Sequence, residues 1–267
     1  MFYCSHYSVY PLRLKRLQPP QDDLFQALFA ALDSLKETFT LQNHDLLCIS
    51  AKVVAIHQGR CRKIHDPAER RKLMQQEADY YIASSLAPDP EPGAAQLNID
   101  FPFTIKDGTP VPFAGIDESN GDGWQILWPE TPQHIAGELR KRIAQRYGVD
   151  SLGLLILDST VLPMRRGCIS LSIAAAGVQL LHSYQGEVDL FGRELKLSET
   201  NIVDRIAGFA GLHMGEGAEQ TPVVVLRGLE RFITEQQEAT GFPRLFMEPE
   251  QDFYAPLFRQ HGEQHLS

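Results

Sequence analysis

Residues 152–159 read LGLLILDS, and this is the most apolar run of the chain. Its Leu and Ile side chains predict a buried strand that ends at Asp158. A carboxylate at the end of a buried strand is costly unless it is paired or bound to a metal ion. Because functional sites gather at the ends of sheet strands, Asp158 and the hydroxyl of Ser159 are candidate metal ligands. The alternative is an aspartate that caps a helix or a turn.

The sequence on either side of this run mixes strand-like and helix-like patterns. Strands are expected at residues 2–10, 46–50, 53–56, 97–105, 124–128, 168–176 and 223–226. Helices are expected at residues 24–35, 69–87, 131–147 and 198–212. Since the two kinds of element do not alternate strictly, their order favours an α+β fold over a doubly wound parallel sheet.

The clearest linker-like stretch is PDPEPG at residues 88–93. We expect a main domain over residues 1–240, with 88–96 as the candidate sub-boundary, and a weakly patterned tail over 241–267. A chain of 267 residues is long enough for one large domain or two small ones. Its 43% of hydrophobic and 22% of charged residues exclude disordered, collagen-like and coiled-coil classes.

The charge balance limits the partners of the protein. With 25 Lys and Arg against 34 Asp and Glu, the net charge is −9, so we expect no binding to nucleic acid or to an anionic membrane. An anionic substrate would need a local cation, and we expect a metal ion.

No apolar run reaches the roughly 18 residues of a membrane helix, and the N-terminus lacks the order of a signal peptide. We therefore expect a cytoplasmic protein with reduced cysteines.

Several well-known chemical motifs are absent from the sequence. There is no P-loop, no GxGxxG, no GxSxG and no HExxH. The loop that begins at Asp117 has Trp128 where a calcium loop needs its twelfth-position Glu, which excludes an EF-hand. His261 and His265 have the spacing of metal ligands on a helix, but a solvated tail is the favoured interpretation.

Two further acidic sites lie in glycine-containing loops. The first is GIDESN at 115–120, where Asp117 offers a hard oxygen ligand and Asn120 an amide for a nucleobase, sugar or phosphate. The second is MGEGAEQT at 214–221, where glycines leave backbone N–H groups for phosphate oxygens and Glu216 offers a metal ligand. The alternatives are an Asx-rich turn for the first, and a helix C-cap with a polar turn for the second.

Taken together, these separated carboxylates favour Mg²⁺ or Mn²⁺ over zinc. Such metals usually accompany phosphates, so the residues predict phosphoryl chemistry without a P-loop. Nearby Arg165, Arg166, Arg193 and Arg227 are candidates to hold a carboxylate or a phosphate in a bidentate fork. For each arginine taken singly, a surface ion pair is the alternative.

Four segments of the chain resemble the coenzyme F-420 γ-glutamyl ligase (CofE-like) family. They are AGIDESN at 114–120, LDSTVLPMRRG at 157–167, YQGEVDLFGREL at 184–195 and MGEGAEQTPVVVLRGL at 214–229. Enzymes of that family use GTP to add L-glutamate to a deazaflavin precursor. The resemblance implies mixed sheets with flanking helices and an intertwined homodimer. It also implies GTP as co-substrate, a two-metal Mg²⁺ or Mn²⁺ site, and a small carboxylate acceptor that receives L-glutamate through an acyl phosphate.

The resemblance also implies roles for single residues. The metal ligands of the family fall on Asp117, Asp158, Ser159 and Glu216, with Ser159 in place of the usual Thr. Its nucleotide contacts fall on Ala51, Lys52, Asn120, Met214, Gly215, Gly217, Ala218, Glu219, Gln220 and Thr221, and an N-terminal contact segment falls near residues 15–18. Asp117 and Asp158 would act in catalysis, and Arg165, Arg166 or Arg193 would hold a substrate carboxylate.

Two departures from the family pattern bear on the substrates. Ile56 stands where the family has a nucleotide-contacting Lys, and residues 161–167 read VLPMRRG in place of GRPWRxG. The second departure, with EQTP at 219–222, is similar to a bacterial subgroup described as folate-metabolism γ-glutamate ligases. The acceptor acid and the choice between GTP and ATP therefore stay open. The alternatives to a ligase are a nucleotide- or metabolite-binding protein and a metal-dependent phosphohydrolase; a structural protein is disfavoured.

Overall fold

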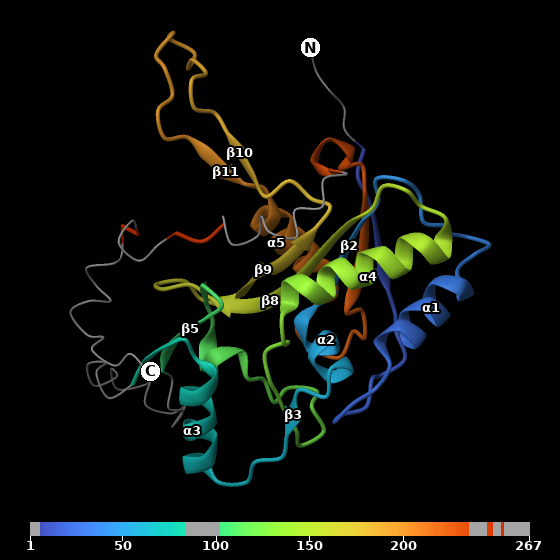
Figure 1. Cartoon of the computed structure of the whole chain (residues 1–267), viewed down its shortest axis with the longest axis vertical. Helices are drawn as coiled ribbons and strands as arrows, with labels where there is room; N and C mark the ends of the chain where they lie inside the picture. Colours follow the sequence, from blue (N-terminus) through green and yellow to red (C-terminus); the bar gives the residue numbers. More distant parts are fainter. Residues whose placement is uncertain (1–5, 84–101, 235–244, 248–251, 254–267) are drawn as a thin grey trace.

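A computed structural model of the chain describes residues 6–83, 102–234, 245–247 and 252–253. Its centre is a five-stranded sheet (Figure 1). In sheet order the strands are β1 (Ser8–Leu12), β12 (Val223–Arg227), β2 (Leu46–Ser50), β8 (Gly153–Val161) and β9 (Cys168–Ala176). The β2–β8 pair is parallel and the other three pairs are antiparallel, so the mixed sheet expected from the sequence is confirmed.

Helices cover both faces of this sheet. On one face lie α1 (Leu24–Ser34), α2 (Ala51–His57) and α4 (Pro132–Tyr147), and on the other lies α5 (Ile202–Met214). Successive strand residues point to opposite faces: Leu154 and Ile156 pack in the core under α1, α2 and α4, whereas Leu155 and Leu157 pack against α5. Burial on both sides explains why the strands read as continuous apolar runs rather than as alternating ones.

Smaller elements surround the central layers. They are β3 (Cys61–Arg62) paired with β7 (Gln125–Ile126), a sheet of β4 (Tyr80–Ile82), β5 (Phe103–Lys106) and β6 (Thr109–Pro110), the helix α3 (Pro67–Glu77), and the 3-10 turns η3 (Pro112–Gly115) and η4 (Glu230–Phe232). The strands β10 (Leu181–Ser183) and β11 (Glu199–Asn201) form the base of an arm, residues 181–201, that projects away from the sheet (Figure 1). No helix among the described residues is both long and apolar enough to cross a membrane.

Two predicted elements have the wrong type or the wrong end. The expected strand at 53–56 is part of helix α2. All four of these side chains are buried, so the segment has no period that separates helix from strand. The helix expected over 69–87 ends at Glu77, because Ala78 has extended backbone and β4 begins two residues later.

Two other elements begin or end at residues that differ from the prediction. Strand β8 does not end at Asp158 but continues to Val161, paired with β9 throughout. Helix α5 begins at Ile202 rather than near Ser198, because residues 199–201 pair with β10 and Asn201 caps the helix. The linker at 88–96, most of the 241–267 tail, and the histidines at 261 and 265 lie outside the described residues, so the expected domain limits stay predictions.

Candidate active site

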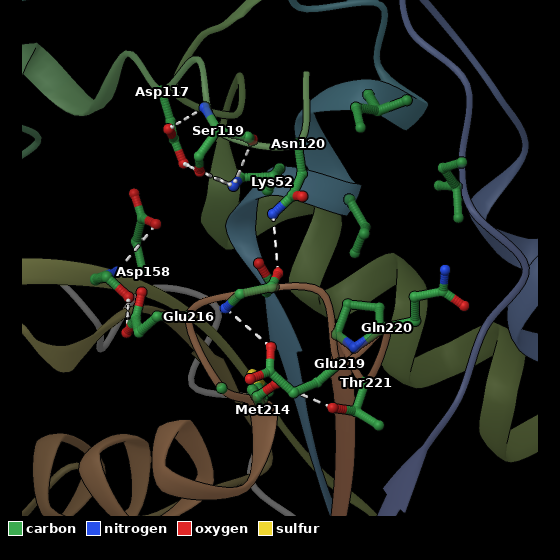
Figure 2. Close-up of a pocket in the computed structure, with 18 of the residues that line it drawn as sticks. Lys52, Asp117, Ser119, Asn120, Asp158, Met214, Glu216, Glu219, Gln220 and Thr221 are labelled. Carbon is green, nitrogen blue, oxygen red and sulfur yellow. Dashed lines mark hydrogen bonds and ion pairs between the residues drawn. The ribbon is translucent and has the colours of Figure 1, made fainter. Parts of the chain in front are cut away.

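A cavity of about 520 Å³ opens beside the end of β2. Four segments line it: the N-terminal residues 14–19, the start of α2, the loop at 111–122, and the loop that follows α5. The middle of β8 lies at its base. These segments are distant in sequence, and Figure 2 shows their polar side chains pointing toward one another.

Asp158 reaches this cavity because of the register of the sheet. Ser50 is the last residue of β2 and pairs with Leu157, so β8 extends beyond its neighbour from Asp158 onward. Beyond this point both Asp158 and Ser159 line the cavity. The strand therefore continues, but one neighbouring strand ends, and the acidic residue lies at that step.

The carboxyl group of Asp158 has a strongly perturbed pKa. Burial is the largest cause, and together with the negative charges of Asp117 and Glu216 it raises the pKa of Asp158 to about 7, although the Ser159 N–H and Lys52 act in the opposite direction. The Ser159 N–H donates to Oδ1 of Asp158 at 3.0 Å. Ser159 Oγ donates to Oε1 of Glu216 at 2.9 Å, which joins β8 to the loop after α5.

Asp117 is held in place by the backbone around it. Its N–H and C=O pair with Ile126 in an isolated bridge. Three residues with positive φ precede it: Phe113 and Ala114 at 56° and Gly115 at 74°. A Cβ at Gly115 would overlap the ring of Trp128. Only glycine meets both demands, because it accepts positive φ and has no Cβ.

Lys52 is the cation nearest to Asp117. Its Nζ lies 2.6 Å from Oδ2 of Asp117, and it donates to the carbonyl and hydroxyl oxygens of Ser119 at 2.9 and 2.8 Å. Burial alone would raise the pKa of Asp117, but the charge of Lys52 and the hydrogen bonds from Lys52 and Ser119 lower that pKa below its ordinary value. The Ser119 N–H donates to Oδ1 of Asp117 at 2.7 Å, so the expected Asx turn is present as well.

The loop after α5 presents backbone groups to the same cavity. Helix α5 ends at Met214 and Gly215 has a φ of 76°. Asn120 Nδ2 donates to the Gly217 carbonyl at 3.0 Å and so ties the two glycine-containing loops together (Figure 2). Thr221 Oγ1 donates to the Met214 carbonyl at 2.9 Å. The alternative interpretation of this segment was a helix C-cap followed by a polar turn. Both features are present, and the same residues also line the cavity.

The structure brings most of the candidate residues to this one cavity. Its walls include Lys52, Asp117, Asn120, Asp158, Ser159, Met214, Gly215, Glu216, Gly217, Ala218, Glu219, Gln220 and Thr221. All the candidate metal ligands offer oxygen atoms. In the described ranges, however, no group of three or more His, Cys, Asp or Glu side chains is already arranged to hold a metal ion. Their roles as ligands stay predictions.

Other candidates lie elsewhere. Ala51 is buried at the start of α2 and is not among the cavity residues, although its neighbours Ser50 and Lys52 are. Arg165 and Arg166 lie on the exposed turn between β8 and β9, and Arg193 lies on the arm. None of these three lines the cavity, because the turn and the arm lead away from the sheet. A fourth arginine, at position 227, binds Asp45 instead.

The sequence placed Ser119 in the loop that begins at Asp117 but did not predict its contact with Lys52. This residue joins Lys52 to Asp117, since its hydroxyl accepts from the ammonium and donates to Oδ2 of Asp117 at 2.9 Å. A Ser two positions after an Asp is the usual spacing of an Asx turn, and this signal was available. The N-terminal wall, residues 14–19, includes the expected contact segment at 15–18.

Comparisons with known proteins find similarity over most of the chain. The family model described as F420-0:Gamma-glutamyl ligase matches residues 12–228. The protein named Coenzyme F420:L-glutamate ligase of Methanopyrus kandleri is 33% identical over 226 residues, which cover 82% of this chain and 86% of that protein. Its namesake from Archaeoglobus fulgidus is 34% identical over 233 residues, 83% of this chain and 87% of the relative.

Proposed function

Since this chain belongs to the F420-0:Gamma-glutamyl ligase family, we propose that it is a ligase that joins L-glutamate to a carboxylate acceptor through an amide bond. One observation carries the proposal. The stretch similar to the family, residues 12–228, contains Asp117, Asp158 and Glu216, and these three carboxylates share one cavity with Lys52 and the glycine-containing loop after α5.

We propose two Mg²⁺ or Mn²⁺ ions as cofactors of this site. The donor chemistry fits, because Asp117, Asp158 and Glu216 offer carboxylates and Ser159 offers a hydroxyl, and these are hard oxygen ligands. The pKa of about 7 for Asp158 arises from burial and from like charges, both of which a bound cation would offset. When bound, the ions would neutralise the charge of the phosphates and of the group in transfer.

GTP is the proposed co-substrate, with ATP as the alternative. The amide of Asn120 and the backbone N–H groups of residues 215–221 would hold the nucleotide, and Lys52 would pair with its phosphates. An acceptor carboxylate oxygen would attack the γ-phosphorus and release GDP. The amine of glutamate would then attack the acyl carbon, and the phosphate would leave with formation of the amide. This order avoids the loss of oxide from a free carboxylate.

The acceptor is proposed to be a small acid of the deazaflavin type, which the resemblance in sequence implies, and the description of the family names F420-0. A folate-like acid is the alternative, because residues 161–167 depart from the family pattern. Both acids carry an aromatic part, which the apolar walls at Leu17, Ile56 and Phe113 would accommodate.

Phosphate release tests these proposals. GTP and ATP are each supplied with Mg²⁺ or Mn²⁺, with and without glutamate and each acceptor acid. A ligase releases phosphate only when nucleotide, glutamate and an acceptor are all present, and the amide product is identified by mass spectrometry. Release without the amine would indicate a phosphohydrolase instead. Nucleotide binding without release under any condition would indicate a binding protein.

We also propose that the protein is a homodimer assembled through the arm. Four apolar side chains project from it: Val188, Leu190, Phe191 and Leu197 are 65%, 99%, 89% and 84% exposed. Such a cluster on one exposed segment is typical of an interaction surface rather than of scattered surface residues. A second copy of the same chain supplies an identical arm, and most soluble oligomers are homo-oligomers.

A further inference from the structure

The cavity contains an internal cation at a proposed metal ligand. Lys52 Nζ lies 2.6 Å from Asp117 and also donates to both oxygens of Ser119, which belongs to the same turn as Asp117. Its side chain is only 24% exposed, whereas that of Asp117 is 46% exposed. The ammonium therefore neutralises Asp117 from within the cavity, where a divalent cation would have to approach the same carboxylate.

A negatively charged side chain of the protein, the exposed Glu219, lies in the loop after α5. Oε2 of Glu219 accepts the N–H of Gly217 at 2.8 Å. The same carboxylate fills the space beside Gly215, since a Cβ on that glycine would overlap it. A carboxylate thus lies in the backbone concavity where the phosphate oxygens of a nucleotide would find N–H donors.

The two loops that hold these charged groups are joined to each other and line the same cavity. Lys52 is bound to the loop that carries Ser119, and the hydrogen bond from Asn120 to Gly217 joins this loop to the one that carries Glu219 (Figure 2). Lys52 therefore occupies a carboxylate that is proposed to bind the metal, and Glu219 occupies the loop that is proposed to bind the nucleotide.

We propose that Lys52 and Glu219 are internal counter-ions that a metal–nucleotide complex displaces together, so that the site selects the complex over free metal or free nucleotide. The inference rests on the proposed function of the cavity. Free metal would leave the Lys52 ammonium next to a dication. Free nucleotide would bring phosphates up to Glu219 and to three further carboxylates. Only the complex offers a phosphate to Lys52 and a metal to Asp117 at the same time.

Two charge-removing variants test this exchange, in which the metal–nucleotide complex replaces the two counter-ions. Lys52→Met and Glu219→Gln keep the length of the side chain, and Lys141→Met and Glu37→Gln make the same charge changes at exposed positions outside the cavity. Binding of Mn²⁺ alone is followed by electron paramagnetic resonance. Binding of a fluorescent GTP analogue is followed with EDTA and again with Mn²⁺.

Opposite effects of one substitution are the expected signature. Lys52→Met should raise the affinity for Mn²⁺ alone by about fivefold, the factor expected for one partly exposed charge pair. It should lower the affinity for the Mn²⁺–nucleotide complex. Glu219→Gln should raise the affinity for nucleotide in EDTA by a similar factor, and both control variants should match the wild type.

The possible failures are distinguishable. If the wild type binds the complex but neither variant changes the binding of Mn²⁺ alone or of nucleotide in EDTA, the exchange is wrong and the proposed function stands. If the wild type binds neither nucleotide nor Mn²⁺ under any condition, the proposed function fails and the exchange fails with it.

Discussion

At the scale of single residues, Asp158 shows how the environment changes the chemistry of one side chain. A free aspartate is ionised at neutral pH, but burial and neighbouring carboxylates raise the pKa of Asp158 to about 7. Near pH 7 the Asp158 carboxyl would therefore carry a proton in about half of the molecules. The folded protein binds this proton more tightly than the unfolded chain does, and that difference makes stability depend on pH.

We expect the Asp158 carboxyl to destabilise the fold progressively as the pH rises. The folded pKa is raised, so the stability associated with the proton is present below the unfolded pKa near 4 and is lost up to about pH 7. Relative to Asp158→Asn, the free energy of unfolding of the wild type should fall by roughly 2–4 kcal/mol over this window. Urea unfolding in EDTA measures it. A constant difference between the two proteins from pH 4 to pH 8 would contradict the pKa.

Gly115 illustrates a second residue-scale constraint. Gly115→Ala should destabilise the protein by about 2–4 kcal/mol, since it adds a strained positive φ and an overlap with the Trp128 ring. The matched control is Gly123→Ala, at a φ of 78° with nothing within 4 Å of its Cβ, where only about 1 kcal/mol of backbone strain is expected. Denaturant midpoints compare the two variants, and equal losses would show that Trp128 is not the cause.

At the scale of elements, a buried ion pair joins the strands around the entry to β2. Arg227 at the end of β12 makes two hydrogen bonds of 2.7 Å to Asp45, which is fully buried, and its guanidinium lies over the rings of Tyr10 and Phe39. Asp45 of this pair immediately precedes β2, whose last residue, Ser50, lines the cavity. The ion pair therefore joins the end of β12 to the start of the strand that leads to the site.

Removal of this arginine should destabilise the folded protein, because it leaves the Asp45 carboxylate buried without its counter-charge. We expect Arg227→Met to lower the free energy of unfolding by about 3–5 kcal/mol. Lys36→Met, which removes an exposed pair with Asp33, should cost less than about 1 kcal/mol. In the double variant with Asp45→Asn, the loss should be smaller than the sum of the single losses. Additive losses would show that the two side chains do not act as a pair.

At the scale of the whole molecule, the arm is the feature that a single chain leaves without an evident purpose. We expect the wild type to be a dimer in solution and the double variant Leu190→Asp with Phe191→Asp to be a monomer, since two charges at these exposed apolar positions would oppose burial. Light scattering after size exclusion measures the mass, and circular dichroism checks the fold. A monomeric wild type, or a dimeric variant, would contradict assembly through the arm.

Local sequence patterns were sufficient for much of the fold. The apolar runs at 46–50, 168–176 and 223–226 are strands, and the helix expected at 131–147 forms with Thr131 as its N-cap and Pro132 as its first residue. Such elements carry their own signals in composition, caps and periodicity. Segment 53–56 carried none, because side chains buried on every side show no period, and there the prediction was wrong.

For this protein the sequence by itself determined the mixed class of the fold and the resemblance to the ligase family. It also identified the acidic candidate residues, which lie in two loops and one strand. Only the tertiary structure decided that Asp158 lies beyond the end of β2, that Lys52 pairs with Asp117, and that Arg165 and Arg193 are not among the residues that line the cavity. The reason is physical: turns and periodicity depend on neighbours in the chain, whereas a contact between residues a hundred positions apart depends on strand register and helix packing, which no local pattern encodes.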